Sequence, residues 1–163
     1  MENTNNPIII TRVFNAPLAK VWAAWSVPEE AKKWWGPVGF SCPSASIDFR
    51  ERGKYLLCMH GDENGPAEFA GQDMWSTGIY KEIVPMKRIV VTDSFSDKDG
   101  NIISGAVFGM PEMPMSVQVE VDFAEEGGAT TMKLTHHDIP EAMRSDCMAG
   151  WNSSFDKLEK SVS

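Results

Sequence analysis

Histidine and cysteine are the residue types best suited to hold a metal ion, but their spacing in this chain does not build a site. His136 and His137 are adjacent in a segment that alternates like a β-strand, so their side chains point to opposite faces. Cys58 and His60 share one face of another strand, yet no second pair stands at a spacing that would complete a zinc site. The sequence therefore predicts no metal ion.

Covalent and cofactor chemistry also lack a signature. The chain contains no G-x-S-x-G nucleophile motif, no cysteine visibly paired with a histidine, and no glycine-rich phosphate loop. We therefore assign no catalytic residue and no cofactor. His136 has the phase of an inward-facing residue, where it would either be a core residue or hydrogen-bond a ligand and exchange protons near neutral pH.

The inward faces of the predicted strands indicate an apolar cavity instead. In the strand 54–60 the odd-numbered residues form the bulkier and less polar face, and in the strand 129–136 the even-numbered residues do. Ligand sites are typically apolar concavities with few polar groups. The expected cavity-lining residues are Tyr55, Leu57, Met59, Met115, Met132, Leu134, His136, Trp151 and Phe155.

The segment from Val107 to Met115 is apolar, yet its prolines prevent a helix. An apolar loop either lies over the core or covers an opening. We expect a lid over the cavity, formed by Phe108, Met110 and Met113. A contact between two copies in a homodimer is the alternative.

These side chains need a sheet to position them. The predicted strands are residues 8–14, 45–50, 54–60, 74–84, 88–95, 115–123 and 129–136. Two short helices are expected after the first strand, and the second of them runs through Trp35. Ser26 with Glu29, and Asp138 with Glu141, have the spacing of capping boxes.

The last predicted element is a long helix from Pro140 to Val162. Its apolar residues recur every three or four positions and form one stripe: Met143, Cys147, Trp151, Phe155, Leu158 and Val162. So long a stripe must pack on an equally long surface, and the concave face of the sheet is the only candidate. The predicted fold is α+β, with a curved antiparallel sheet wrapped around the C-terminal helix.

Composition restricts the partners of the chain. A length of 163 residues fits a single domain over 1–163. A net charge of -8 argues against nucleic acid and against anionic membrane surfaces. Three widely spaced cysteines, with no apolar leader and no membrane-length apolar run, predict reduced thiols in a cytoplasmic protein.

Several motifs together resemble the branch of the START-related (SRPBCC) superfamily that is named after the activator of the heat-shock protein 90 ATPase. They lie in the family's order at residues 16–25, 34–40, 78–89, 134–136 and 150–158. The resemblance covers nearly the whole chain. It implies a helix-grip fold with an inner cavity, as in proteins that bind lipids, hormones or polyketides, but it implies no single reaction.

Three functions are therefore considered, in order of preference. The first is binding of an apolar or aromatic small molecule in the cavity. The second is a cyclase- or hydratase-type enzyme, which would need further inward polar groups such as Asp48 or Glu68. The third is a protein-interaction role that stimulates a chaperone ATPase, and it rests on the family name alone.

Overall fold

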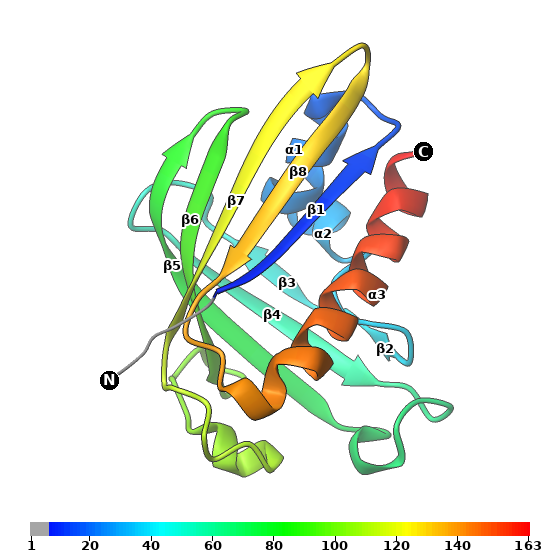
Figure 1. Cartoon of the computed structure of the whole chain (residues 1–163). Helices are drawn as coiled ribbons and strands as arrows, with labels where there is room; N and C mark the ends of the chain where they lie inside the picture. Colours follow the sequence, from blue (N-terminus) through cyan, green and yellow to red (C-terminus); the bar gives the residue numbers. More distant parts are fainter. Residues whose placement is uncertain (1–6) are drawn as a thin grey trace.

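The computed structural model describes residues 7–163, which form a curved sheet, three α-helices and short 3-10 turns (Figure 1). The strands are β1 (Ile8–Phe14), β2 (Phe40–Ser41), β3 (Ala45–Ile47), β4 (Lys54–Gly61), β5 (Asp73–Val84), β6 (Arg88–Ser96), β7 (Val117–Glu126) and β8 (Ala129–His136). The helices are α1 (Leu18–Ser26), α2 (Pro28–Ala31) and α3 (Arg144–Val162). The 3-10 turns are Ala67–Phe69, Gly105–Phe108 and Glu141–Met143.

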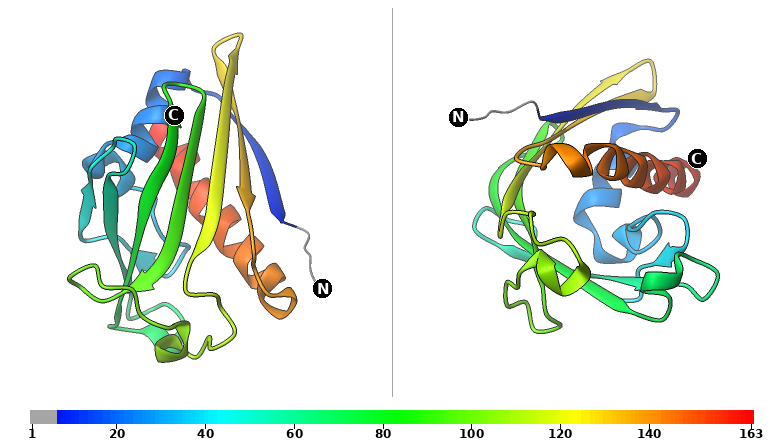
Figure 2. Two further views of the ribbon diagram at one scale, coloured as in Figure 1. Left: turned by 90° about the vertical axis from the view of Figure 1, so that its left-hand side faces the viewer. Right: turned by 60° about the horizontal axis from the view of Figure 1, so that its bottom comes forward.

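The strands form one antiparallel sheet in the order β1-β8-β7-β6-β5-β4-β2, with β3 also paired to β4. The sheet curls so that its concave face surrounds α3, α1 and α2 (Figure 2). The predicted α+β helix-grip fold is thereby confirmed. Among the described residues no helix is long and apolar enough to cross a membrane.

The hairpin of β7 and β8 explains how the sequence sets the curved face. Along β7 the buried side chains Val117, Val119, Val121 and Phe123 alternate with more accessible polar ones. Because side chains alternate across a strand, this pattern fixes which face turns inward. The connecting residues, Gly127 and Gly128, have φ values of 61° and 82°, which glycine adopts without steric cost.

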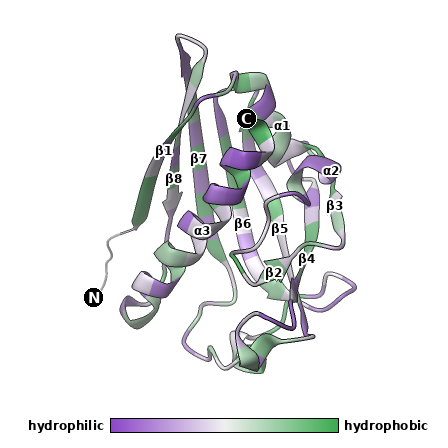
Figure 3. Ribbon diagram, turned by 90° about the vertical axis from the view of Figure 1, so that its right-hand side faces the viewer, coloured by the Kyte–Doolittle hydropathy of each residue, from purple (hydrophilic) through white to green (hydrophobic). Residues whose placement is uncertain are grey.

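The helix α3 packs its apolar stripe against the concave face, as the sequence predicts. Phe155, Leu158 and Val162 are buried, whereas Trp151 and Cys147 are only partly covered. Hydrophilic residues recur along the outward side of the helix (Figure 3). In addition to this apolar packing, the exposed side chain of Asp156 in α3 accepts a hydrogen bond from Arg12 of β1 at 2.8 Å.

Both predicted capping boxes are wrong. Ser26 Oγ donates to the carbonyl oxygen of Trp22 within α1, at 2.9 Å, and α2 begins after Val27 with no side-chain cap. The start of α3 has no side-chain cap either, because a 3-10 turn separates it from Asp138.

The second helix is also shorter than predicted, since it ends at Ala31. Trp34 and Trp35 follow it in a turn and loop. Trp34 is 1% exposed, and its indole Nε1 donates to the carbonyl oxygen of Ala24 at 2.8 Å. Burial of this ring decides the path of the chain in place of helix propensity.

Candidate functional site

The sheet and α3 enclose a cavity of about 380 Å³, here called the larger cavity. Its walls are the inward faces of β4, β5 and β6, the N-terminal half of α3, and residues 35–40 and 110–114. Most of the lining is apolar: Trp35, Pro37, Phe40, Met59, Phe69, Met74, Trp75, Phe95, Met110, Met113, Pro114, Ile139, Met143, Cys147 and Trp151. A smaller cavity of about 40 Å³ shares Trp35, Asp93 and Trp151 with it.

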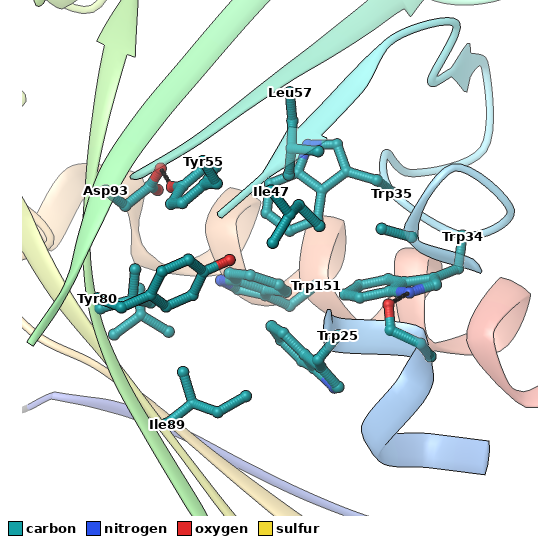
Figure 4. A pocket seen from close by; sticks show the side chains of 14 residues that line it. Trp25, Trp34, Trp35, Ile47, Tyr55, Leu57, Tyr80, Ile89, Asp93 and Trp151 are labelled. Carbon is teal, nitrogen blue, oxygen red and sulfur yellow. Dashed lines mark hydrogen bonds between the residues drawn. The ribbon is translucent and has the colours of Figure 1, made fainter. Parts of the chain in front are cut away.

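Tryptophan rings fill the space beside the smaller cavity (Figure 4). The ring centroids of Trp25 and Trp34 are 4.8 Å apart, those of Trp34 and Trp35 5.5 Å, and those of Trp35 and Trp151 5.9 Å. Such edge-to-face contacts bind α1 and the turn after α2 to α3. The end of the fold near α1 is therefore packed, and the open volume lies beside residues 110–114.

Five of the nine predicted lining residues border a cavity. Tyr55 and Leu57 line the smaller one, Met59 and His136 line the larger one, and Trp151 lines both. Register supports the inward phase, since Leu57 and Met59 lie opposite Ser76 and Met74, which also line the larger cavity.

Three further predicted residues are buried but belong to the packed core. Met132, Leu134 and Phe155 are each 0% exposed and line neither cavity. Trp25 covers Met132, with its Nε1 3.2 Å from the Met132 sulfur. The predicted inward phase of these residues is correct, but the periodicity does not indicate that Trp25 of α1 packs on Met132 and Phe155.

The prediction for Met115 is wrong. This residue is 51% exposed and lines neither cavity. The reason is that β7 begins at Val117, so Met115 precedes the strand and its alternation does not reach it.

Of the three residues expected in a lid, Met110 and Met113 line the larger cavity. Phe108 does not, because its ring packs on Phe95 with centroids 5.2 Å apart. The segment is held by backbone hydrogen bonds from Met110 to Gly105 at 2.8 Å and from Met113 to Met110 at 3.2 Å.

His136 is 4% exposed, and its geometry fixes its tautomer. The indole Nε1 of Trp151, which can only donate, lies 2.9 Å from His136 Nδ1. Nδ1 is therefore the acceptor, and the neutral ring carries its proton on Nε2. Burial, reinforced by nearby His137, lowers the pKa of His136 to about 4, so the ring is neutral at pH 7. Among the described residues no group accepts a hydrogen bond from Nε2.

Asp93 is a candidate site residue that sequence reasoning missed. It borders both cavities, and the Tyr55 hydroxyl donates to its Oδ1 at 2.6 Å (Figure 4). Burial raises the pKa of Asp93, while the hydrogen bonds from Tyr55 and from the Ser94 backbone oppose that shift. A signal was present: Asp93 alternates with Val91 and Phe95, which places a carboxylate on the apolar face of its strand.

One cysteine does lie beside a histidine, contrary to the sequence reading. Cys147 Sγ is 3.6 Å from His136 Nδ1. Burial, together with the charge of Asp93, raises the pKa of Cys147 to about 12. The thiol is therefore protonated at neutral pH, whereas a nucleophilic cysteine requires a thiolate. All three cysteines are free.

The inward polar groups named for the enzyme alternative lie elsewhere. Asp48 is exposed and pairs with Arg50 at 2.9 Å, and Glu68 is exposed in a 3-10 turn. Within residues 7–163 no three histidine, cysteine or acidic side chains gather in a way that could hold a metal ion.

Comparison with known proteins agrees with this architecture. A solved structure from Chromobacterium violaceum has 27% identity and a TM-score of 0.77, with 96% of each chain covered. The AHSA1 protein from Silicibacter pomeroyi shares the fold at 22% identity and a TM-score of 0.73, covering 95% of this chain and 96% of that one. A solution structure of a protein from Staphylococcus epidermidis also shares the fold, at 23% identity and a TM-score of 0.74. The alignment covers 99% of this chain and 92% of that one.

A comparison with curated proteins gave no match. The family described as activator of Hsp90 ATPase homolog 1-like protein matches residues 15–163. Because that match spans nearly all of the sequence, the chain belongs to the activator of Hsp90 ATPase homolog 1-like family.

Proposed function

We propose that the chain binds a mainly apolar small molecule in the larger cavity. The observation that carries the proposal is the cavity itself, which measures about 380 Å³ and is lined mostly by aromatic rings and methionines. Ligand pockets are usually apolar clefts of about 300–1,000 Å³ with a few convergent polar groups. Methionine side chains adapt to ligands of different shape.

His136 supplies a polar anchor for this ligand. Its Nε2–H is a buried donor without a partner among the described residues, and an unsatisfied buried donor costs about 1–3 kcal/mol. A carbonyl, ether or hydroxyl oxygen on the ligand would remove that cost once the side chains that cover Nε2 move aside. Trp151 holds the ring in the orientation and tautomer that the interaction needs.

Met110 and Met113 would cover the ligand on the side of the 3-10 turn Gly105–Phe108. Both side chains border the cavity, and both are partly exposed. We propose that this segment is displaced as a ligand enters and then packs on it.

Asp93 gives the second candidate function its support. A cyclase- or hydratase-type enzyme would use the same cavity with one or two groups that exchange protons, and Asp93 is a half-buried carboxylate whose pKa is raised by desolvation. Chromatography with mass analysis of a bound ligand after incubation separates the two functions, because retention time distinguishes isomers of equal mass. An unchanged ligand supports binding alone, and a rearranged or hydrated product supports the enzyme.

The binding proposal is tested by filling the cavity without damaging the fold. Gly150 lines the larger cavity within α3, and a Cβ added there meets no heavy atom within 4 Å. Gly150→Leu therefore places a side chain in open space and also improves helix propensity. The control is Ala149→Leu, which makes a similar change at an exposed neighbour outside the cavity.

The measurement is titration with the neutral probe N-phenyl-1-naphthylamine, whose fluorescence rises in apolar surroundings. We expect saturable binding by the parent protein and by Ala149→Leu, and at least ~10-fold weaker binding by Gly150→Leu with no loss of melting temperature. Equal binding by all three proteins would place the probe outside the cavity and contradict the proposal.

A further inference from the structure

The larger cavity contains a carboxylate, Asp93, that is paired with no cationic side chain of the described residues. Asp93 lies on the concave face of β6, opposite Val117 in the register. The Tyr55 hydroxyl donates to it, but no Lys, Arg or His side chain of residues 7–163 acts on it. A carboxylate removed from water without a cation is unfavourable, because a neutral hydrogen bond replaces only part of its hydration.

The other lining residues do not compensate for this charge. Among the described residues around the larger cavity the charged side chains are Asp93 and Asp146, with no Lys or Arg. Asp146 is exposed in the first turn of α3, where the helix dipole stabilises a negative charge. Asp93 is not at a helix N-terminus. The cationic side chain of Lys157 lies beside the lining, but it donates instead to the carbonyl oxygens of Phe40 at 2.7 Å and Pro37 at 3.2 Å.

Aromatic rings stand beside this carboxylate. Tyr55 is hydrogen-bonded to Asp93, and the Trp35 ring contacts those of Tyr55 and Trp151, with centroid separations of 6.5 Å and 5.9 Å (Figure 4). The faces of such rings attract cations, and a desolvated site strengthens that attraction. Asp93 and the Trp35 and Trp151 rings all line the larger cavity, so an organic cation there could meet both a carboxylate and aromatic faces.

We infer that the ligand of the larger cavity is a cationic amphiphile, an apolar body carrying an ammonium group that pairs with Asp93. This inference rests on the proposed function and narrows its ligand class. The neutral His136 ring adds no opposing charge, and its Nε2–H serves an uncharged oxygen of the same ligand. Fatty acids and other carboxylates are disfavoured, because they would bring a second negative charge toward Asp93.

The test compares three probes that share an eight-carbon chain and differ only in the head group: octylammonium, octan-1-ol and octanoate. Isothermal titration calorimetry at pH 7 measures their affinities for the full chain. We expect octylammonium to bind at least ~10-fold more tightly than octan-1-ol, and octanoate to bind most weakly.

Asp93→Asn removes the charge and keeps an oxygen that can accept from Tyr55. In this variant we expect octylammonium to bind no more than about twofold more tightly than octan-1-ol. The control is Asp99→Asn, the same substitution at a residue in an exposed turn whose side chain does not line the cavity. It should keep the full preference of the parent protein.

The outcomes separate the two proposals. If octan-1-ol or octanoate binds the parent protein as tightly as octylammonium, or if Asp93→Asn keeps the preference, the cationic ligand class is wrong and cavity binding stands. If none of the three probes binds, cavity binding and this inference both fail. The ranking on the parent protein needs no variant, so poor folding of Asp93→Asn would leave the test intact.

Discussion

His136 links the chemistry of the cavity to the stability of the fold. Its pKa is lowered to about 4 by burial, whereas an imidazole in the unfolded chain titrates near 6.5. As pH falls from 6.5 toward 4, the unfolded state therefore takes up a proton that the folded state refuses. The stability associated with the neutral ring is complete above pH 6.5 and is lost across that window, by roughly 3 kcal/mol in total.

We predict that His136→Asn flattens this part of the pH profile, because an amide oxygen can still accept from Trp151 without titrating. Urea unfolding of both proteins at pH 7 and at pH 4.5 measures the effect, and subtraction of the two profiles cancels the carboxylates common to both. If the free energy of unfolding changes equally between pH 7 and pH 4.5 in both proteins, His136 is not held neutral by burial.

At the scale of residues, the sequence predicted which way side chains point better than it predicted which groups they contact. The alternation of the strands correctly turned His136, Leu57 and Met59 inward. It did not reveal the indole donor to His136 or the thiol beside it, because both come from a different element, α3, at positions 15 and 11 residues further along the chain. Such contacts depend on how the helix is rotated against the sheet, which periodicity does not specify.

At the scale of elements, α3 is attached to the sheet by the C-terminal half of its stripe. Leu158 is 0% exposed, so Leu158→Ala should lower the free energy of unfolding by about 2–5 kcal/mol. Lys160 is an exposed residue of the same helix, and Lys160→Ala should stay within about 0.5 kcal/mol of the parent. Chemical denaturation measures both, and a small loss for Leu158→Ala would mean that the helix does not pack as described.

The turn between β7 and β8 offers a test that involves no side-chain packing. Gly127 has φ 61°, and a Cβ added there meets no heavy atom within 4 Å. Gly127→Ala should therefore be destabilising through backbone conformation alone, by about 1–2 kcal/mol, and Gly127→Asn by less. If melting curves of the two variants coincide with that of the parent, the left-handed turn is not present in solution.

The elements themselves were largely predictable, because the strands and α3 carry strong periodicity. β1 and β8 begin and end at the predicted residues. The failures fall at helix starts and at Trp34 and Trp35, where burial of a large ring overrides the local signals for capping and for helix continuation.

At the scale of the whole molecule, the function depends on a volume that the sequence could not measure. Side chains from α1 and α2 fill one end of the space under the sheet, and the other end remains open as the larger cavity. Whether a helix-grip interior is solid or hollow depends on the sum of many ring positions. Here the open end adjoins Met110 and Met113, the two residues we expect to cover a ligand.

The central claim is that the larger cavity accepts an apolar ligand, and a crystal of the protein soaked with 2-bromonaphthalene tests it most directly. Anomalous scattering locates bromine without reference to any assumed pose. We predict one dominant bromine peak between Met59 and His136, under the N-terminal half of α3. Crystals that show no bromine there, with the side chains of Met110 and Met113 occupying the space, would contradict the account.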